Sequence, residues 1–274
     1  MAVRNGFAWI LVLILLVPTA APLEAQLRPL PPYDRSLLEG ARMFAVEVGV
    51  GVYDDQLASL AGTRGRLIEV GTIEVAWRLD RIILEAGGTI LRWFRDESTF
   101  AAPVGGARPS DDGRRVDVGD FRIATIIPLI SRQAGGFLLR FGTRLPTTDN
   151  GVGLERDQTD FFALLGGNLA RGTWSFSAES GLGIHGTRDE DDEQYDVLLY
   201  SVTTRYRKGV AVAHLAVLGQ EGGRDWWTRG NEDLHEARLG VRFGERRWVG
   251  AQVVRGLGRF SPDVGLTLTA GAKL

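Results

Sequence analysis

Charged side chains recur at alternate positions inside stretches that are otherwise apolar. In residues 137–145, Arg140 and Arg144 fall on one side of the alternation, while Leu139 and Phe141 fall on the other. Guanidinium and carboxylate groups in such rows could pair with each other, or bind a charged solute through paired hydrogen bonds. Eleven charged residues share the polar side of their segments: Glu47, Glu74, Arg78, Glu85, Arg122, Arg140, Arg144, Asp160, Glu179, Arg238 and Arg242.

The segments that carry these residues have the spacing of β-strands. In residues 44–53, Val46, Val48 and Val50 share one face, and Glu47 lies on the other. Strict alternation of this kind indicates a half-buried strand, and a tilted membrane strand needs ~9–11 residues. We expect twelve strands, at residues 44–53, 67–79, 82–94, 116–127, 137–145, 159–169, 173–185, 195–206, 210–220, 234–243, 248–257 and 264–274.

The connections between these segments differ in length according to their order. After even-numbered strands they are short, as at Asp80-Arg81, with a longer exception at 128–136; after odd-numbered strands most are long, as at 54–65 and 95–115. Bacterial membrane barrels have short periplasmic turns and longer outer loops. The sequence therefore predicts an all-β fold: a transmembrane, antiparallel, up-and-down β-barrel of about twelve strands, with ten or fourteen left open.

Aromatic residues give a second indication of membrane strands, because many of them stand near strand ends. Aromatic rings favour the interface between bilayer and water, so two belts are expected at the two rims of a barrel. Trp77, Phe137, Trp174, Tyr206, Phe243 and Trp248 stand beside short turns, and Tyr53, Trp93, Phe94 and Tyr195 stand beside long loops.

A membrane barrel turns its apolar side chains to lipid and its polar ones to the lumen. An Arg or Lys on the lipid face costs about 2–4 kcal/mol at the midplane. We therefore expect the eleven charged residues to line the lumen and, being long, to leave only a narrow pore. Two interpretations stay open: ion pairs that merely brace the wall, and a constriction that selects a solute by its charge.

The N-terminal residues indicate how the chain reaches a membrane. Arg4 precedes an apolar run at 7–17 and a small-residue stretch at 18–25, which is typical of a secretory signal peptide. The chain has no Cys, so a lipoprotein anchor and a disulfide framework are excluded. We expect localisation in the outer membrane of a Gram-negative cell. Three parts are expected: a signal peptide at 1–25, a Pro-rich periplasmic linker or small lumenal plug at 26–42, with the linker favoured, and a barrel at 43–274.

Enzymatic chemistry has one candidate centre. Ser175, Ser177, Glu179 and His185 share one parity of residues 173–185, and hydrolysis needs a Ser nucleophile with a His base. The sequence around His185 lacks the His-x-Ser and Ser-Asn-Gly signatures of outer-membrane lipid hydrolases. His185 also stands at a position whose side chain is expected to face the lumen. We predict that the chain is not an enzyme, with a hydrolase using His185 as a minor alternative.

Cofactors and nucleic acid are not expected. Three scattered His and no Cys make a zinc site improbable, and no dinucleotide or phosphate-binding loop occurs. A formal net charge of −2 gives no argument for nucleic acid. The acidic run 189–193 is interpreted as a solvated loop, with a site for a divalent cation as the alternative.

One stretch resembles a known family. Residues 140–149 read Arg-Phe-Gly-Thr-Arg-Leu-Pro-Thr-Thr-Asp, and a Gly-rich loop and an Asp follow. This resembles the outer-membrane barrels named for the MetA-pathway of phenol degradation, which carry a Gly-x-Lys-Leu-Pro-Thr-Gly type of motif. Arg144 stands where Lys is usual, and Thr148 where Gly is usual. The matching residues are Gly142, Arg144, Leu145, Pro146, Thr147 and Asp160. The resemblance implies transport of small, often aromatic or apolar, compounds.

These observations predict an outer-membrane channel that passes small molecules, aromatic or apolar ones included, through a narrow charge-lined lumen. The alternative is a structural or adhesive barrel with a sealed lumen. The expected partners are outer-membrane lipids, lipopolysaccharide, a small-molecule solute and the barrel-assembly machinery, and the oligomeric state stays open.

Overall fold

Strands account for most of the described chain, because the alternating segments pair with their neighbours in sequence order. The computed structural model describes residues 27–34, 37–38, 43–132, 134–186, 194–222 and 232–274. Among them, no helix is long and apolar enough to cross a membrane. The strands are β1 (Phe44–Ala58), β2 (Thr63–Leu79), β3 (Ile82–Thr99), β4 (Arg114–Asp117), β5 (Phe121–Arg132), β6 (Gly135–Leu145), β7 (Asp160–Arg171), β8 (Trp174–Gly186), β9 (Gln194–Lys208), β10 (Ala211–Gly222), β11 (Leu234–Phe243), β12 (Arg247–Gly256) and β13 (Val264–Lys273).

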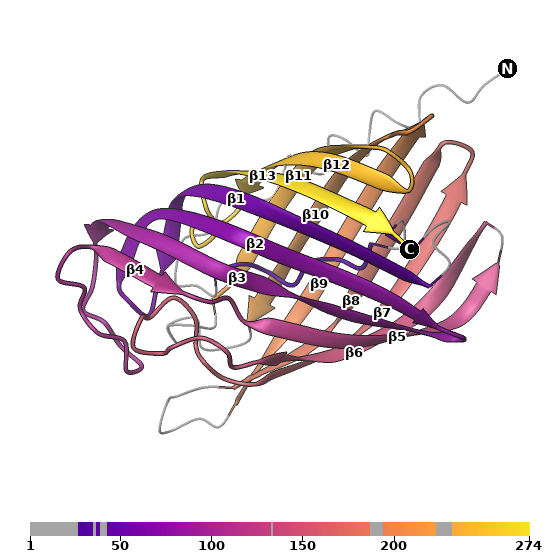
Figure 1. Ribbon diagram of the computed structural model, residues 1–274. Helices are drawn as coiled ribbons and strands as arrows, with labels where there is room; N and C mark the ends of the chain where they lie inside the picture. Colours follow the sequence, from indigo (N-terminus) through magenta and orange to yellow (C-terminus); the bar gives the residue numbers. More distant parts are fainter. Residues whose placement is uncertain (1–26, 35–36, 39–42, 133, 187–193, 223–231) are drawn as a thin grey trace, which may run out of the picture.

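The strands close into one antiparallel barrel (Figure 1). Closure comes from β1 and β13, which pair from Ala45↔Lys273 to Asp54↔Val264. β4 and β5 both pair with β3, so together they form one position in the wall, interrupted at residues 118–120. The wall therefore has twelve positions, which confirms the predicted fold class and strand number.

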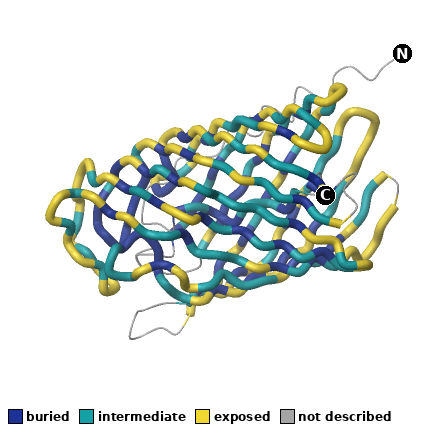
Figure 2. Tube along the Cα trace, viewed as in Figure 1, coloured by how far each residue is buried: buried dark blue, intermediate teal, exposed yellow. Residues whose placement is uncertain are grey.

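The two faces of the wall are inverted relative to a water-soluble protein. In β1, Val48, Val50 and Val52 are exposed on the outer face, whereas Gly51 and Tyr53 are buried on the inner face. Figure 2 shows buried and exposed residues alternating along the strands in this way. An apolar outer face of this kind fits a bilayer, because lipid chains do not demand polar partners.

Several strands are longer than expected, and this changes two connections. β1 and β2 stay paired as far as Ala58↔Thr63, so the first outer connection is residues 59–62 and not the long loop expected at 54–65. β5 and β6 pair as far as Arg132↔Gly135, so the longer turn expected at 128–136 is also wrong. Backbone hydrogen bonds hold these additional pairs together, and the alternation of apolar side chains along the sequence gives no information about them.

Residues 27–34 and 37–38, here called the inner segment, lie against the inner wall. Leu27 belongs to a buried cluster with Tyr53 and Phe94, near the long loops. Tyr33, Leu37 and Leu38 belong to another cluster, whose wall residues include Ala45, Ala76 and Trp248, near the short turns. The inner segment therefore runs along the barrel axis from one rim towards the other (Figure 1).

Candidate functional site in the barrel lumen

A cavity of about 300 Å³ lies beside the inner segment inside the barrel. The inner segment borders it through Arg28, Pro31 and Asp34, and the wall supplies charged side chains from both halves of the barrel. Its charged and imidazole lining is Arg28, Asp34, Glu47, Glu69, Glu74, Glu85, Arg92, Asp120, Arg122, Arg144, Glu155, Arg205, His214, Arg238 and Arg242.

The most buried guanidinium of the lumen belongs to Arg140 in β6, whose side chain is 1% exposed. Its Nε donates to Glu85 Oε2 at 2.8 Å, and its Nη1 lies 3.4 Å from Glu179 Oε2. Nη1 also donates to the Pro31 carbonyl at 2.9 Å, and the Tyr33 backbone N–H donates to Glu179 Oε2 at 3.1 Å. This cluster therefore joins three strands to the middle of the inner segment.

A second cluster holds the end of the inner segment near the long loops. Arg28 Nε and Nη2 donate to the two Glu236 oxygens at 2.7 and 2.9 Å, and Arg238 Nη2 donates to the same carboxylate at 2.8 Å. The Arg28 guanidinium also lies 4.0 Å from the centre of the Tyr53 ring. A fully buried carboxylate is thus shared by two cations, which compensates its loss of hydration.

The carboxylate of Asp34 interacts with two strands of the wall, β9 and β11. Arg205 Nη2 in β9 lies 3.0 Å from Asp34 Oδ1, and Arg242 Nη1 in β11 lies 3.7 Å from Asp34 Oδ2. The inner segment is therefore bound to the wall by opposite charges at several heights.

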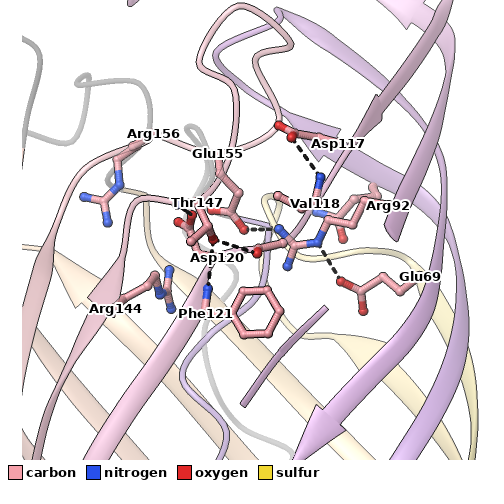
Figure 3. Close-up of polar contacts among 12 residues, drawn as sticks. Glu69, Arg92, Asp117, Val118, Asp120, Phe121, Arg144, Thr147, Glu155 and Arg156 are labelled. Atoms are coloured by element: carbon pink, nitrogen blue, oxygen red, sulfur yellow. Dashed lines mark hydrogen bonds and ion pairs between the residues drawn. The ribbon is translucent and has the colours of Figure 1, made fainter. Parts of the chain in front are cut away.

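The lumen near the long loops contains a network that Figure 3 shows in close-up. Arg92 in β3 donates to Glu69 at 2.9 Å and to Glu155 at 2.6 Å. Asp120 and Glu155 lie between Arg92 on one side and Arg144 on the other (Figure 3). Asp120 Oδ1 accepts a hydrogen bond from the Thr147 backbone N–H at 3.2 Å. Burial, and then the nearby Glu155 carboxylate, raise the pKa of the Asp120 carboxyl above its ordinary range.

The eleven residues singled out in the sequence lie on the inward parity but not at one site. Glu85, Arg140 and Glu179 meet in one cluster, and Glu74 meets Arg122. Arg144 lies 3.9 Å from Asp160 near the long loops, and Glu47 accepts from Trp248 Nε1 at 2.5 Å. Arg238 and Arg242 bind Glu236 and Asp34 respectively, while Arg78 is exposed at the rim of short turns and donates to the Leu38 carbonyl at 3.3 Å.

Sequence reasoning missed Glu69 and Arg92, because the inward parity changes within their strands. Val70 pairs with Leu91 and Thr72 pairs with Thr89, so the regular pairing of β2 with β3 is interrupted at Gly71 and Ile90. Gly71 has a φ of 68°, a left-handed conformation that glycine adopts without strain. Both Glu69 and Glu74 therefore point inward although they stand on opposite parities. A single glycine within a strand can mark a bulge, so Gly71 was the signal in the sequence for this change of parity.

Other missed residues belong to segments whose placement depends on long-range contacts. Arg28 and Asp34 belong to the inner segment, and Glu155 lies in the connection between β6 and β7.

Among the described residues, no group of three or more His, Cys, Asp or Glu could hold a metal ion. The acidic run 189–193 and the expected signal peptide at 1–25 lie outside the described residues.

Comparison with known proteins agrees with this architecture. No protein-family model matches the sequence, and no curated protein sequence does. The NanC porin has a TM-score of 0.53 at 8% identity, over 84% of this chain and 98% of that chain. The COG4313 outer membrane channel from Pseudomonas putida F1 has a TM-score of 0.54 at 13% identity, over 85% of this chain and 95% of that chain.

At these identities the likeness shows the fold alone. The resemblance of residues 140–149 to the phenol-degradation barrels therefore stays a prediction. What the closed wall, the apolar outer face and the two structural relatives establish together is an outer-membrane type of β-barrel, with the architecture found in channels.

Proposed function

We propose that the chain is a narrow outer-membrane channel for small polar or charged solutes. The observation that carries this proposal is the cavity of about 300 Å³ beside the inner segment, which carboxylates and guanidiniums line together. Rings of charged side chains select solutes in pores by favouring counter-charges at the constriction. The charged lining supports polar solutes better than the aromatic or apolar ones that the family resemblance implies.

Both signs of charge line the cavity on more than one side. Glu69 and Glu74 belong to β2, whereas Arg205 belongs to β9, which stands six wall positions away in a wall of twelve. Arg92 and Arg122 pair with Glu69 and Glu74, and Arg205 pairs with Asp34, so a solute on either side would meet carboxylates and guanidiniums together. The proposed solutes are therefore small ions or molecules that carry both signs of charge.

The inner segment narrows the pore in this proposal and acts as the small plug considered for residues 26–42. Its Leu30 packs against Phe162 and Leu164 on one side of the lumen. Its Arg28 and Asp34 pair with charged residues of β9 and β11. These contacts place the remaining free volume beside the segment, so removal of the segment should widen the pore.

A hydrolase is not part of this proposal. His185 is buried and stands on the inward parity of β8, paired in register with Tyr195 of β9. A phospholipid hydrolase needs its nucleophile and base where a lipid can reach them, on the outer face of the wall. The position of His185 therefore supports a barrel without covalent chemistry.

The experiment is conductance across a planar bilayer, with the refolded chain from residue 26 compared with a variant that lacks residues 27–34. Small discrete current steps that become larger in the deletion variant are the expected result. A matched control is Arg95→Gln, which removes a charge from the exposed end of β3 and should leave the step size unchanged.

A sealed structural barrel is the second candidate, and occupation of the lumen by the inner segment favours it. Protein that migrates as a folded barrel in electrophoresis, inserts into the bilayer and never conducts, with or without residues 27–34, would contradict the channel proposal. It would leave the sealed barrel as the function to pursue.

A further inference from the structure

Each of the five short turns has at least one exposed basic side chain, either within the turn or at the adjoining strand end. The turns join β2 to β3, β5 to β6, β7 to β8, β9 to β10 and β11 to β12. Only two exposed acidic residues, Asp80 and Glu245, stand in the described parts of these turns, although the whole chain has a formal net charge of −2. The exposed cations, here called the basic ring, are Arg81, Arg132, Arg171, Lys208, Arg246 and Arg247.

At the opposite end of the barrel, several cations pair with carboxylates of the chain itself. There, Arg64 lies 2.7 Å from Asp55, Arg66 lies 2.6 Å from Asp54, and Arg115 lies 3.1 Å from Asp96. None of the six cations of the basic ring forms an ion pair with a described residue. Their charge is therefore available to an anion from outside the chain.

An aromatic side chain stands on the outer face beside every one of these turns. These rings are between 37% and 61% exposed, and the centres of the Trp174 and Tyr206 rings lie 4.9 Å apart. Aromatic rings of this kind favour the headgroup level of a bilayer. The basic ring, a few residues further along each strand, therefore lies at the level of lipid phosphates. The five aromatic residues are Trp77, Phe137, Trp174, Tyr206 and Phe243.

We propose that the basic ring binds the phosphate groups of anionic glycerophospholipids. Because short turns of such barrels face the periplasm, these lipids belong to the periplasmic leaflet. Lys and Arg near an anionic surface strengthen its binding by roughly fivefold per residue. The ring thus gathers anionic lipids around the barrel and holds the short turns at one depth. This inference rests on the outer-membrane location and is independent of whether the lumen conducts.

The test measures quenching of tryptophan fluorescence in vesicles of phosphatidylcholine that contain either brominated phosphatidylglycerol or brominated phosphatidylcholine. Trp77 and Trp174 stand beside the basic ring and report lipid contact there. The full barrel should favour the phosphatidylglycerol several-fold. Arg132→Gln, Arg171→Gln and Lys208→Gln together should reduce that preference at least threefold.

The matched control removes three exposed cations from the opposite end, through Arg66→Gln, Arg95→Gln and Arg114→Gln together. This control variant should keep the preference of the unmodified barrel for brominated phosphatidylglycerol. Equal quenching by the two lipids in the unmodified barrel would overturn the proposal, and would leave an acidic polymer or protein of the periplasm as the partner. An equal loss in both triple variants would also overturn it, because net charge alone would then explain the effect.

A second measurement serves if the triple variant does not refold. The preference of the unmodified barrel for brominated phosphatidylglycerol is then measured at low and at high ionic strength. Binding to exposed charges should weaken several-fold as salt screens them, since the screening length falls from about 10 Å at 0.1 M to about 3 Å at 1 M. A preference that salt does not change would contradict a role for the exposed ring.

Discussion

Arg140 of β6 reaches across β5 to Glu85 of β3, with 2.8 Å between Arg140 Nε and Glu85 Oε2. The pair is nearly inaccessible to water, and the same guanidinium also holds the Pro31 carbonyl of the inner segment. One side chain therefore links two wall strands that are not neighbours and fixes the inner segment against them.

Replacement of Arg140 by Ala should destabilise the barrel more than removal of any exposed cation. Glu85 and Glu179 would be left as buried carboxylates without their cation, and breaking a buried pair in this way costs about 3–5 kcal/mol. The measurement is the urea midpoint of refolded protein in detergent micelles. Arg95→Ala, at an exposed position of β3, should change stability by less than about 0.5 kcal/mol. Equal midpoints for the two variants would refute the structural role of Arg140.

Asp34→Asn should shift the ion preference of the pore towards anions. The substitution leaves Arg205 and Arg242 without the carboxylate that they share, so the lumen gains net positive charge. The pair is partly exposed, so stability should change by only about 0–1 kcal/mol. The measurement is the reversal potential under a salt gradient. The control is Asp263→Asn, which removes a carboxylate that lies outside the strands. If Asp34→Asn leaves the reversal potential unchanged, Asp34 does not lie along the ion path.

Asp120→Asn should raise stability relative to the unmodified barrel at high pH but not at low pH. The folded state raises the pKa of the Asp120 carboxyl above its unfolded value of about 3.9, so the folded state binds the proton more tightly. The resulting stabilisation is present below about pH 4 and is lost as the pH rises through the raised pKa. Unfolding midpoints of both proteins at about pH 4 and pH 8 test this sign.

The control for Asp120 is Glu97→Gln, which removes one exposed carboxylate at the end of β3 near the long loops. The Asn side chain can still accept the hydrogen bond from the Thr147 backbone N–H, so the comparison isolates the charge. A difference between Asp120→Asn and the unmodified barrel that stays constant from pH 4 to pH 8 would contradict the raised pKa.

Gly271→Ala should displace the Trp248 ring. A Cβ atom at position 271 would lie 2.2 Å from Trp248 Cζ2 and 2.7 Å from the Val46 carbonyl oxygen. Overpacking of this kind typically costs about 1–3 kcal/mol, and the hydrogen bond from Trp248 Nε1 to Glu47 would be strained. Gly167→Ala, whose Cβ would approach no atom closer than 3.4 Å, is the control. Equal stability of the two variants would show that the ring can move freely.

Much of the wall could be predicted from the sequence, because lipid contact imposes a period of two on every strand. Val48 and Val50 face outward and Glu47 faces inward for that reason alone. The ends of β1 and β2 could not be predicted, since Ala58 and Thr63 pair through backbone groups outside the apolar band. The change of parity at Gly71 could not be placed either, because a glycine within a strand has several possible causes.

The lumen was harder to predict than the wall. The alternation indicated that Arg140, Glu85 and Glu179 share the inward parity, but not that they meet, because their sequence separations are 55 and 39 residues. Register decides which inward residues stand at the same height, and it depends on the pairing of all intervening strands.

The sequence by itself determined which face of most strands meets lipid and that the strands form a closed wall of about twelve. Those properties follow from local alternation and from turn positions, which need no distant partner. Only the tertiary structure decided that Arg28 binds Glu236 and that Asp34 binds Arg205, because these pairs require the inner segment to lie within a wall that is already closed. The free energy of such contacts depends on position in space, and alternation along the chain does not contain that information.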